Sequence, residues 1–250
     1  MLRIRSETRR VKHWRLAIVV VPVTLAAALL QTGGSQPPVR IPSEVAWTDE
    51  TLALVNSGDA MRGLILARRC ERCHGAEGFS PTPAVPNLAA MDKLTTWKQL
   101  DDFRSGKRKS GLMQPIAAAL TLRQSADVAA YYAIVPNTPD PQDSRSFPER
   151  SSKASMARVA VPLITLGDGQ RGIPPCQACH GPVAYVKGAP SLGTQNGLYI
   201  LNQLNGFSDW SRANDINIRM RSIAGQLTPE ERQALSDYYG AGYAYQPPAE

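Results

Sequence analysis

A six-residue pattern that occurs twice constrains this chain more than any other feature. Cys-x-x-Cys-His-Gly stands at residues 70–75 (CERCHG) and again at residues 176–181 (CQACHG), 106 residues later. The 250-residue chain has four cysteines and three histidines, and only His13, in a basic leader, lies outside these two motifs. A fixed-period repeat of this kind predicts two related modules.

The similarity between the two halves extends well beyond the motifs, and the methionine-to-tyrosine spacing is 18 residues in both. We therefore expect homologous modules at 51–136 and 158–244, joined by a linker at 137–157 rich in proline, serine and charge. The matched pairs are SGDAMRG (57–63) with LGDGQRG (166–172), Pro86 with Pro190, Phe103 with Phe207, Met113 with Met220, and Tyr131-Tyr132 with Tyr238-Tyr239.

The apolar spacing is helical, and no segment has the alternation of a strand. One helix start is marked by residue type: Thr228 as N-cap, Pro229 at the first position and Glu231 as the capping-box partner. That helix is expected to run to Tyr239 and end at Gly240. The expected helices are 51–70, 97–104, 125–132 and 228–239.

Cys-x-x-Cys-His is the attachment signature of c-type haem, in which two thiols bond to the porphyrin and the histidine ligates the iron. Zinc ribbons bring their cysteine pairs within about 15–20 residues, and thioredoxin-like pairs need a βαβ context that is absent here. An exported protein could also form disulfides, but the histidine after each pair favours haem. We predict two covalently bound haems c, on Cys70, Cys73 and His74 and on Cys176, Cys179 and His180.

The sixth ligand of each iron is expected to be methionine, because no histidine remains for that position. Met113 and Met220 occupy matched places, 43 and 44 residues after the first cysteine of their modules. Met91 is interpreted as core filler. Iron with both axial positions filled has no open site for substrate, so an electron carrier is favoured over an enzyme. A diheme peroxidase or a gas sensor would need an open iron.

Two further matched pairs have candidate roles. A backbone carbonyl near Pro86 or Pro190 is a candidate acceptor for the second ring N–H of the ligating histidine, although a simple turn explains these prolines equally. Arg108 and Arg212 lie shortly before the methionines. They are either partners of haem propionates or solvated surface charges.

The N-terminus predicts export. Residues 1–15 hold six of the basic side chains and one acid, which explains most of the net charge of +7 and removes the case for nucleic-acid binding. The uncharged run 16–30 follows, then a proline-rich tether at 31–50. A basic start before an apolar run is an export signal or a membrane anchor. We favour an uncleaved anchor on the periplasmic side of the bacterial inner membrane over a soluble periplasmic protein with a cleaved signal.

From about Gly58 to Gly240 the sequence resembles the cytochrome c4 family of tandem class I cytochromes. The resemblance rests on the two motifs, the P-x-L turns, the Q-L-x-x-F segments at Gln99 and Gln203, and Ser211-Arg-Ala-Asn-Asp before Met220. It implies a mainly α fold of two pseudo-symmetric domains with His/Met ligation, His74 with Met113 and His180 with Met220. The first module departs from the family in its KRKSGLM segment, and the tether departs from the soluble members.

The expected function is single-electron transfer between periplasmic or membrane-bound redox proteins, with a quinol- or dehydrogenase-side donor and a terminal oxidase as the implied destination. The alternative is a cytochrome subunit of a membrane dehydrogenase or oxidase complex. The predicted anchor favours the alternative, and the family resemblance favours the free carrier.

Overall fold

The computed structural model describes residues 47–136, 150–181, 186–193 and 195–241. The predicted leader at 1–30 and nearly all of the predicted tether lie outside these residues. The described residues belong to one compact unit that contains both repeats. In the part of the chain that is described, no helix is long and apolar enough to cross a bilayer.

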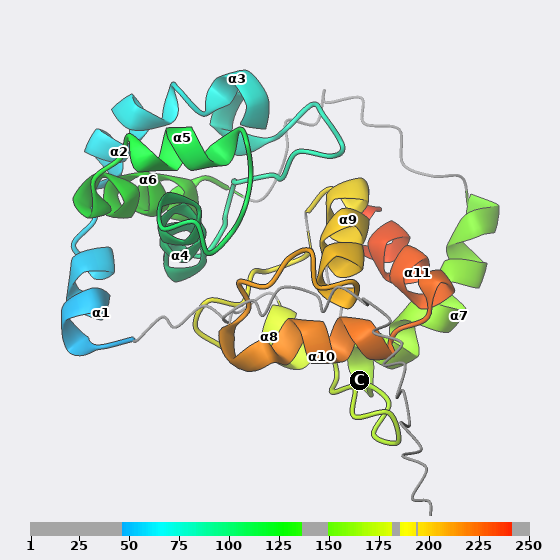
Figure 1. Ribbon diagram of the computed structural model, residues 1–250. Helices are drawn as coiled ribbons and strands as arrows, with labels where there is room; N and C mark the ends of the chain where they lie inside the picture. The colour runs from blue at the N-terminus through cyan, green and yellow to red at the C-terminus, as the bar shows by residue number, and fades with distance from the viewer. Residues whose placement is uncertain (1–46, 137–149, 182–185, 194, 242–250) are drawn as a thin grey trace, which may run out of the picture. The chain divides into compact units, whose positions relative to one another are not determined.

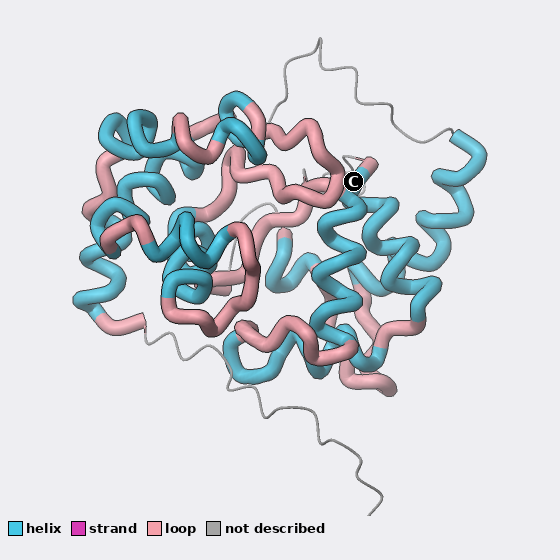
Figure 2. Tube along the Cα trace, turned by 45° about the horizontal axis from the view of Figure 1, so that its top comes forward, coloured by secondary structure: helices cyan, strands magenta, loops and turns pink. Residues whose placement is uncertain are grey.

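Every regular element within the described ranges is helical, which confirms the mainly α prediction (Figures 1 and 2). The first lobe, residues 47–136, contains α1 (Asp49–Asn56), α2 (Ala60–Ala67), α3 (Glu71–His74), η1 (Ala76–Gly78), α4 (Lys93–Arg104), α5 (Met113–Ala118) and α6 (Leu122–Ile134). The second lobe, residues 150–241, contains α7 (Arg150–Thr165), α8 (Gln177–His180), α9 (Gly197–Ser208), η2 (Ile216–Ile218), α10 (Arg219–Gln226) and α11 (Pro229–Gly240).

The single helix predicted over 51–70 is wrong, because α1 and α2 are separated by a break at residues 57–59. Asp59 is the N-cap of α2, and its carboxylate accepts the N–H groups of Met61 and Arg62 at 2.9 and 3.0 Å. Gly58 lies against the backbone of α6, where an added Cβ would stand 2.2 Å from the Ala126 oxygen. The apolar spacing continues across this break, so periodicity alone could not reveal it.

The other helix predictions are confirmed in place, with shifted ends. The helix expected at 97–104 begins earlier, at Lys93, because Asp92 accepts the N–H of Thr95 at 2.9 Å. The capping box between Thr228 and Glu231 is formed, with bonds of 3.2 and 2.8 Å. Gly240 is the last residue of α11, and Ala241 caps it.

Two predicted boundaries differ from the structure. Helix α7 starts at Arg150, so the last eight residues of the predicted linker 137–157 are helical, and residues 137–149 lie outside the described ranges. Residues 150–161 contain neither glycine nor proline, which leaves nothing to stop a helix. Similarly, α1 takes in the last two residues of the predicted tether.

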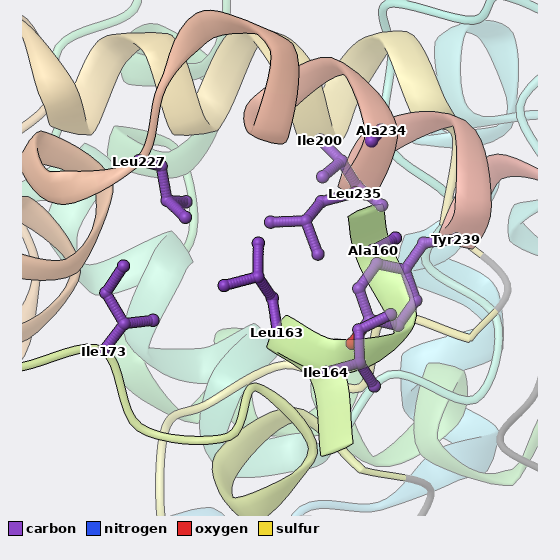
Figure 3. Close-up of a cluster of buried hydrophobic side chains, with 9 residues drawn as sticks. All are labelled: Ala160, Leu163, Ile164, Ile173, Ile200, Leu227, Ala234, Leu235 and Tyr239. Atoms are coloured by element: carbon purple, nitrogen blue, oxygen red, sulfur yellow. The ribbon is translucent and has the colours of Figure 1, made fainter. Parts of the chain in front are cut away.

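Each lobe packs around its last helix. In the first lobe α6 contacts α1, α2 and α4, and its Tyr132 is fully buried. In the second lobe α11 contacts α7 and α9, and Figure 3 shows Tyr239 beside Ile164 and Leu235 in a cluster of buried apolar side chains. Burying a leucine or isoleucine side chain of this kind stabilises a fold by about 1.5–3 kcal/mol.

A matched arginine ties the segment before each motif to the last helix. The guanidinium of Arg62 donates to both carboxylate oxygens of Asp127 at 2.9 Å and to Asp59 at 3.0 Å. Arg171 binds Glu231 in the same two-pronged way, at 2.7 and 2.9 Å. Paired N–H bonds to a carboxylate fix geometry as well as charge. The repeat SGDAMRG and LGDGQRG therefore encodes one structural contact in both lobes.

Candidate haem sites

Each Cys-x-x-Cys-His motif folds as a single helical turn. The N–H of His74 bonds to the carbonyl of Cys70 at 2.9 Å, and the N–H of His180 bonds to Cys176 at the same distance. Residues at positions i, i+3 and i+4 share one face of a helix. The turn therefore presents both thiols and the imidazole to the same side, as attachment along one porphyrin edge requires.

The two histidines are oriented by matched carbonyl groups. Nδ1 of His74 lies 2.8 Å from the oxygen of Pro86, and Nδ1 of His180 lies 2.8 Å from the oxygen of Pro190. This confirms the predicted role of the prolines. When Nδ1–H donates to a carbonyl, Nε2 is left as the metal-binding nitrogen. Burial lowers the pKa of both imidazoles, which favours the neutral form that ligates iron.

A single cavity of about 850 Å³ connects the two motifs. All eight predicted site residues line it, four from each lobe: Cys70, Cys73, His74, Met113, Cys176, Cys179, His180 and Met220. Met113 is the first residue of α5, and Met220 lies in the first turn of α10. Each methionine is therefore positioned by the N-terminal turn of a helix. Met91 also lines the cavity, which differs from the core position predicted for it.

The chemistry of the cavity fits haem. Burial raises the pKa of the Cys70 thiol, and it raises that of Cys176 to about 11, so both are protonated at neutral pH, unlike metal-bound thiolates. Within the described residues, no cluster of three or more His, Cys, Asp or Glu could hold a bare metal ion. Apolar walls suit a porphyrin, and cationic side chains suit its carboxylates.

The charges that line the cavity are almost all positive. Among the residues that the structure describes, one carboxylate reaches the cavity, that of Asp215, and this group is paired with buried Arg221 at 2.7 Å. The basic residues along the wall are Arg69, Lys98, Lys107, Arg108, Lys109, Arg212 and Arg219. Of these cations, Arg108 and Arg212 are half-buried and form no ion pair with a carboxylate of the described residues. A buried cation without a counter-charge is costly, so these two arginines suit a cofactor that carries its own negative charges.

The lobes meet through two matched arginines and two matched glutamines. Arg108 donates to Gln99 of its own lobe at 2.7 Å and to Gln203 of the other lobe at 2.9 Å. Arg212 donates to Gln203 of its own lobe at 2.8 Å and to Gln99 at 3.2 Å. Each glutamine oxygen therefore accepts from both arginines. This crossed arrangement is the one expected for an interface between two copies related by a two-fold axis.

Both arginines are partly buried, so the alternative of a solvated surface charge is excluded. The guanidinium of Arg108 lies 4.6 Å from the centre of the Phe103 ring, and that of Arg212 lies 4.4 Å from the centre of Phe207. Burial lowers the pKa of Arg212. Burial alone would raise the pKa of Tyr199, but the two neighbouring guanidinium groups lower it overall.

A second part of the interface has no counterpart across the pseudo-symmetry. Lys98 and Asp102, one turn apart on α4, form an ion pair of 2.5 Å with both side chains buried. Lys98 also donates to the carbonyl of Asn214 in the second lobe at 2.7 Å, and the Asn214 amide donates to Asp102 at 2.7 Å. The matched second-lobe positions are Asn202 and Gly206, which carry no charge.

The interface roles of Lys98, Asp102 and Asn214 were not predicted from the sequence. Gln99 and Gln203 were noted only as part of the family resemblance. The available signal for the ion pair was Lys98 and Asp102 at i and i+4 on an expected helix, a spacing usually found on solvated faces. Their burial depends on the other lobe, which no local pattern encodes.

Comparison with known proteins agrees with this geometry. No family model matches the chain. The chain is 36% identical to cytochrome c4 of Thiocapsa roseopersicina over 173 residues, 68% of this chain and 84% of that protein. With cytochrome c4 of Pseudomonas aeruginosa it shares 32% identity over 186 residues, 73% of this chain and 88% of that protein. The chain belongs to the cytochrome c4 family.

Another relative is the thiosulfate dehydrogenase electron acceptor of Stutzerimonas stutzeri, 39% identical over 69% of this chain and 78% of that protein. Among solved structures, reduced cytochrome c4 from Pseudomonas stutzeri superimposes with a TM-score of 0.65 at 29% identity, covering 74% of this chain and 99% of that one. Thiosulfate dehydrogenase from Marichromatium purpuratum gives 0.60 at 29% identity, covering 72% of this chain and 39% of that one.

These relatives confirm several of the predictions. The chain is a c-type cytochrome with two covalently bound haems, and it has the two-domain fold of cytochrome c4. It transfers electrons and is a carrier rather than an enzyme in its own right. Its partners are redox proteins.

Proposed function

We propose that the chain carries single electrons on the periplasmic side of the membrane, using one haem in each lobe. In the first lobe Cys70 and Cys73 attach the haem, and His74 and Met113 ligate the iron. In the second lobe Cys176 and Cys179 attach it, and His180 and Met220 ligate it. The single observation that carries this assignment is the cavity reached by all eight side chains.

The chain's own residues have three tasks in this mechanism. The carbonyls of Pro86 and Pro190 hold the imidazoles so that Nε2 faces the cavity. Met113 and Met220 would each supply the second protein ligand to a haem iron, which would leave no site for substrate and would raise the potential. The arginine–glutamine contact keeps the two sites in one fixed arrangement. A bound haem supplies reversible one-electron chemistry between ferric and ferrous iron.

Within this function we propose that the electron donor is a dehydrogenase. The support is that relatives at 39% and 32% identity are thiosulfate dehydrogenase electron acceptors, and that a solved thiosulfate dehydrogenase contains a similar domain pair. We propose a terminal oxidase as the eventual destination of the electrons. We also propose that the two repeated modules are residues 51–136 and 158–244, with boundaries taken from the sequence repeat.

The assignment is tested with a visible spectrum of the reduced protein, with and without CO, and with haem quantified per chain. Two low-spin haems that do not bind CO support the full ligand set. Met113→Ala and Met220→Ala should each leave both haems attached but open one iron to CO. If neither variant binds CO and both stay low-spin, the methionine assignment is wrong.

A second candidate is a cytochrome subunit anchored to a membrane complex, favoured by the basic start and the apolar run at 16–30. Fractionation of the full-length chain tests it. Recovery with membranes, and release to the periplasm when residues 1–30 are replaced by a cleavable signal, supports the anchor. A soluble mature protein that begins near Leu29 supports a cleaved signal and a free carrier.

A further inference from the structure

The segment before Met113 is unusually basic and exposed. Lys107 and Lys109 flank Arg108, and both lysine side chains are exposed. Across the residues that the structure describes, neither ammonium group has an ion-pair or hydrogen-bond partner. These two charges therefore do not stabilise the fold, and they are available to another molecule.

The same lysines belong to the edge of the cavity. Lys107 and Lys109 line it, and so does Arg69, which directly precedes the first motif cysteine and is exposed as well. Side chains that both line a cavity and face solvent mark the place where it opens. We call Arg69, Lys107 and Lys109 the basic rim. Every charged side chain that lines the cavity from the described first lobe is a cation.

Two exposed apolar side chains that follow the lysines closely in the sequence also line the cavity. Leu112 is 79% exposed and Ile116 is 44% exposed, and both line the cavity on either side of Met113. An apolar patch surrounded by charge has the composition of a transient protein interface, where apolar contact excludes water and the polar rim sets orientation. Exposure of large apolar groups next to a cofactor site marks a surface for interaction.

The second lobe lacks this surface at its matched positions. Pro175 stands where Arg69 stands in the first lobe, Ser211 matches Lys107, and Ala213 matches Lys109. The residue before its methionine is Arg219 rather than a leucine. Arg219 is exposed and lines the cavity, so the described second lobe has one cation of this kind against three in the first. The cluster of three that forms the basic rim therefore belongs to the first lobe.

We propose that the first lobe docks an acidic redox protein, with the basic rim against carboxylates that surround the partner's cofactor and Leu112 and Ile116 at the centre of the contact. The proposal rests on the proposed electron-carrier function and deepens it by assigning one lobe to an acidic partner. In that encounter the partner gives up one electron, which reduces one ferric haem iron to ferrous, and no bond or proton is exchanged.

The charge pattern suits such a transient contact. Complementary charge raises the rate of encounter by roughly 10–10³-fold at low salt. Salt screens exposed charges over about 10 Å at 0.1 M ionic strength, so the attraction is expected to disappear at higher salt. Redox encounters bury a small area, and two or three cations are therefore a large share of the contact.

The test compares two variants of the full holoprotein with equal changes in net charge. Lys107→Glu/Lys109→Glu reverses two charges of the basic rim. Arg158→Glu/Lys187→Glu reverses two exposed charges of the second lobe that do not line the cavity. The probe is a flavodoxin, a small FMN protein with an acidic surface. Its binding is measured by calorimetry, and haem reduction by the reduced flavodoxin is followed by stopped flow, each at 10 and 300 mM salt.

We expect the rim variant to lose at least tenfold in both affinity and second-order rate at low salt, with little difference left at high salt. The second-lobe variant should stay within about twofold of the wild type. Equal losses in both variants, or no loss in the rim variant, would overturn the proposal. Reduction by uncharged photoreduced riboflavin should be the same in all three proteins. If wild-type haem cannot be cycled by riboflavin at all, the electron-carrier function itself fails.

Discussion

The two lobes agree in how they orient the histidines and in the arginine–glutamine part of their interface, and they differ most in the loop that supports the methionine. Both have the motif turn, the proline carbonyl on the histidine and the crossed arginine–glutamine bonds. The loop from arginine to methionine, however, is three residues longer in the second lobe. A repeated module can therefore keep its chemistry while the loop that delivers the ligand is rebuilt.

Different interactions support the two loops from arginine to methionine. In the second lobe the buried pair of Asp215 and Arg221 supports the loop, with Arg221 stacked 4.7 Å from the centre of the Trp210 ring. The longer path also places Asn217 and Ile218 at positive φ, 55° and 60°. Such a conformation is costly for a β-branched residue and persists only where the surroundings hold it. In the first lobe the corresponding loop contains Gly111 and Lys109, one of the two exposed lysines of the basic rim.

The largest expected effect follows from removing the support found only in the second lobe. Asp215→Ala leaves the guanidinium of Arg221 buried, and arginine cannot lose its proton to relieve the cost. We expect a loss of about 3–5 kcal/mol in the free energy of unfolding, measured by denaturant titration. Met220 should also dissociate from iron more readily, seen as CO binding to one haem.

Asp168→Ala is the matched control, because its pair with Arg171 is about one-third exposed on both sides. Exposed pairs contribute about 0–1 kcal/mol. Equal losses in the two variants would contradict the idea that the second methionine loop depends on its buried ion pair.

An intermediate effect is expected from Asp102→Ala, which breaks the asymmetric part of the interface. Lys98 would keep the Asn214 carbonyl as its acceptor but lose its counter-charge. Burial already lowers the pKa of Lys98, an effect that Asp102 opposes. Unlike Arg221, this side chain can release its proton, so we expect a smaller loss, about 2–3 kcal/mol near pH 6.

Because Lys98 can release its proton, the stability lost in Asp102→Ala should depend on pH. With Asp102 gone, the folded-state pKa of Lys98 falls further below its unfolded value of about 10.4. Between those two values the unfolded chain binds more protons than the folded one, so the free energy of unfolding rises with pH. The deficit of Asp102→Ala should therefore shrink between pH 6 and pH 9.5 in denaturant titrations. A constant deficit would mean that Lys98 stays charged in the variant.

The comparison also shows which features a sequence can predict. All eight site residues that were predicted from the repeat line one cavity. They could be predicted because covalent haem attachment requires a fixed local spacing, and because the same residues recur at matched positions in both copies. Capping residues located the start of α11 for the same local reason. The break at Gly58 was missed because it depends on close approach to α6, a contact 68 residues away in the chain.

The interface was the least predictable part. Lys98 and Asp102 look like a solvated helix pair until the second lobe covers them. Arg108 and Arg212 were recognised as a matched pair, but their crossed contacts depend on how two distant helices meet. Pairings across an interface follow from tertiary packing, whereas motif spacing and helix caps are local.

The smallest expected effect concerns the part of the interface that is symmetric. Arg108→Gln and Arg212→Gln each remove one positive charge from the cavity wall while keeping a hydrogen-bonding side chain. A nearby cation disfavours ferric iron, so its loss lowers the reduction potential. At roughly 10 Å and an effective dielectric of about 20 the interaction is about 1–2 kcal/mol, which corresponds to roughly 40–80 mV for one electron.

Because each arginine contacts both lobes, each substitution should lower both haem potentials in a spectroelectrochemical titration rather than one. Lys187→Gln, an exposed change away from the cavity, is the control and should shift neither potential measurably. A shift confined to the haem of the substituted arginine's own lobe would show that the crossed contacts are structural only. In that case the asymmetric pair of Lys98 and Asp102 would be the better candidate for a charge that distinguishes the two haems.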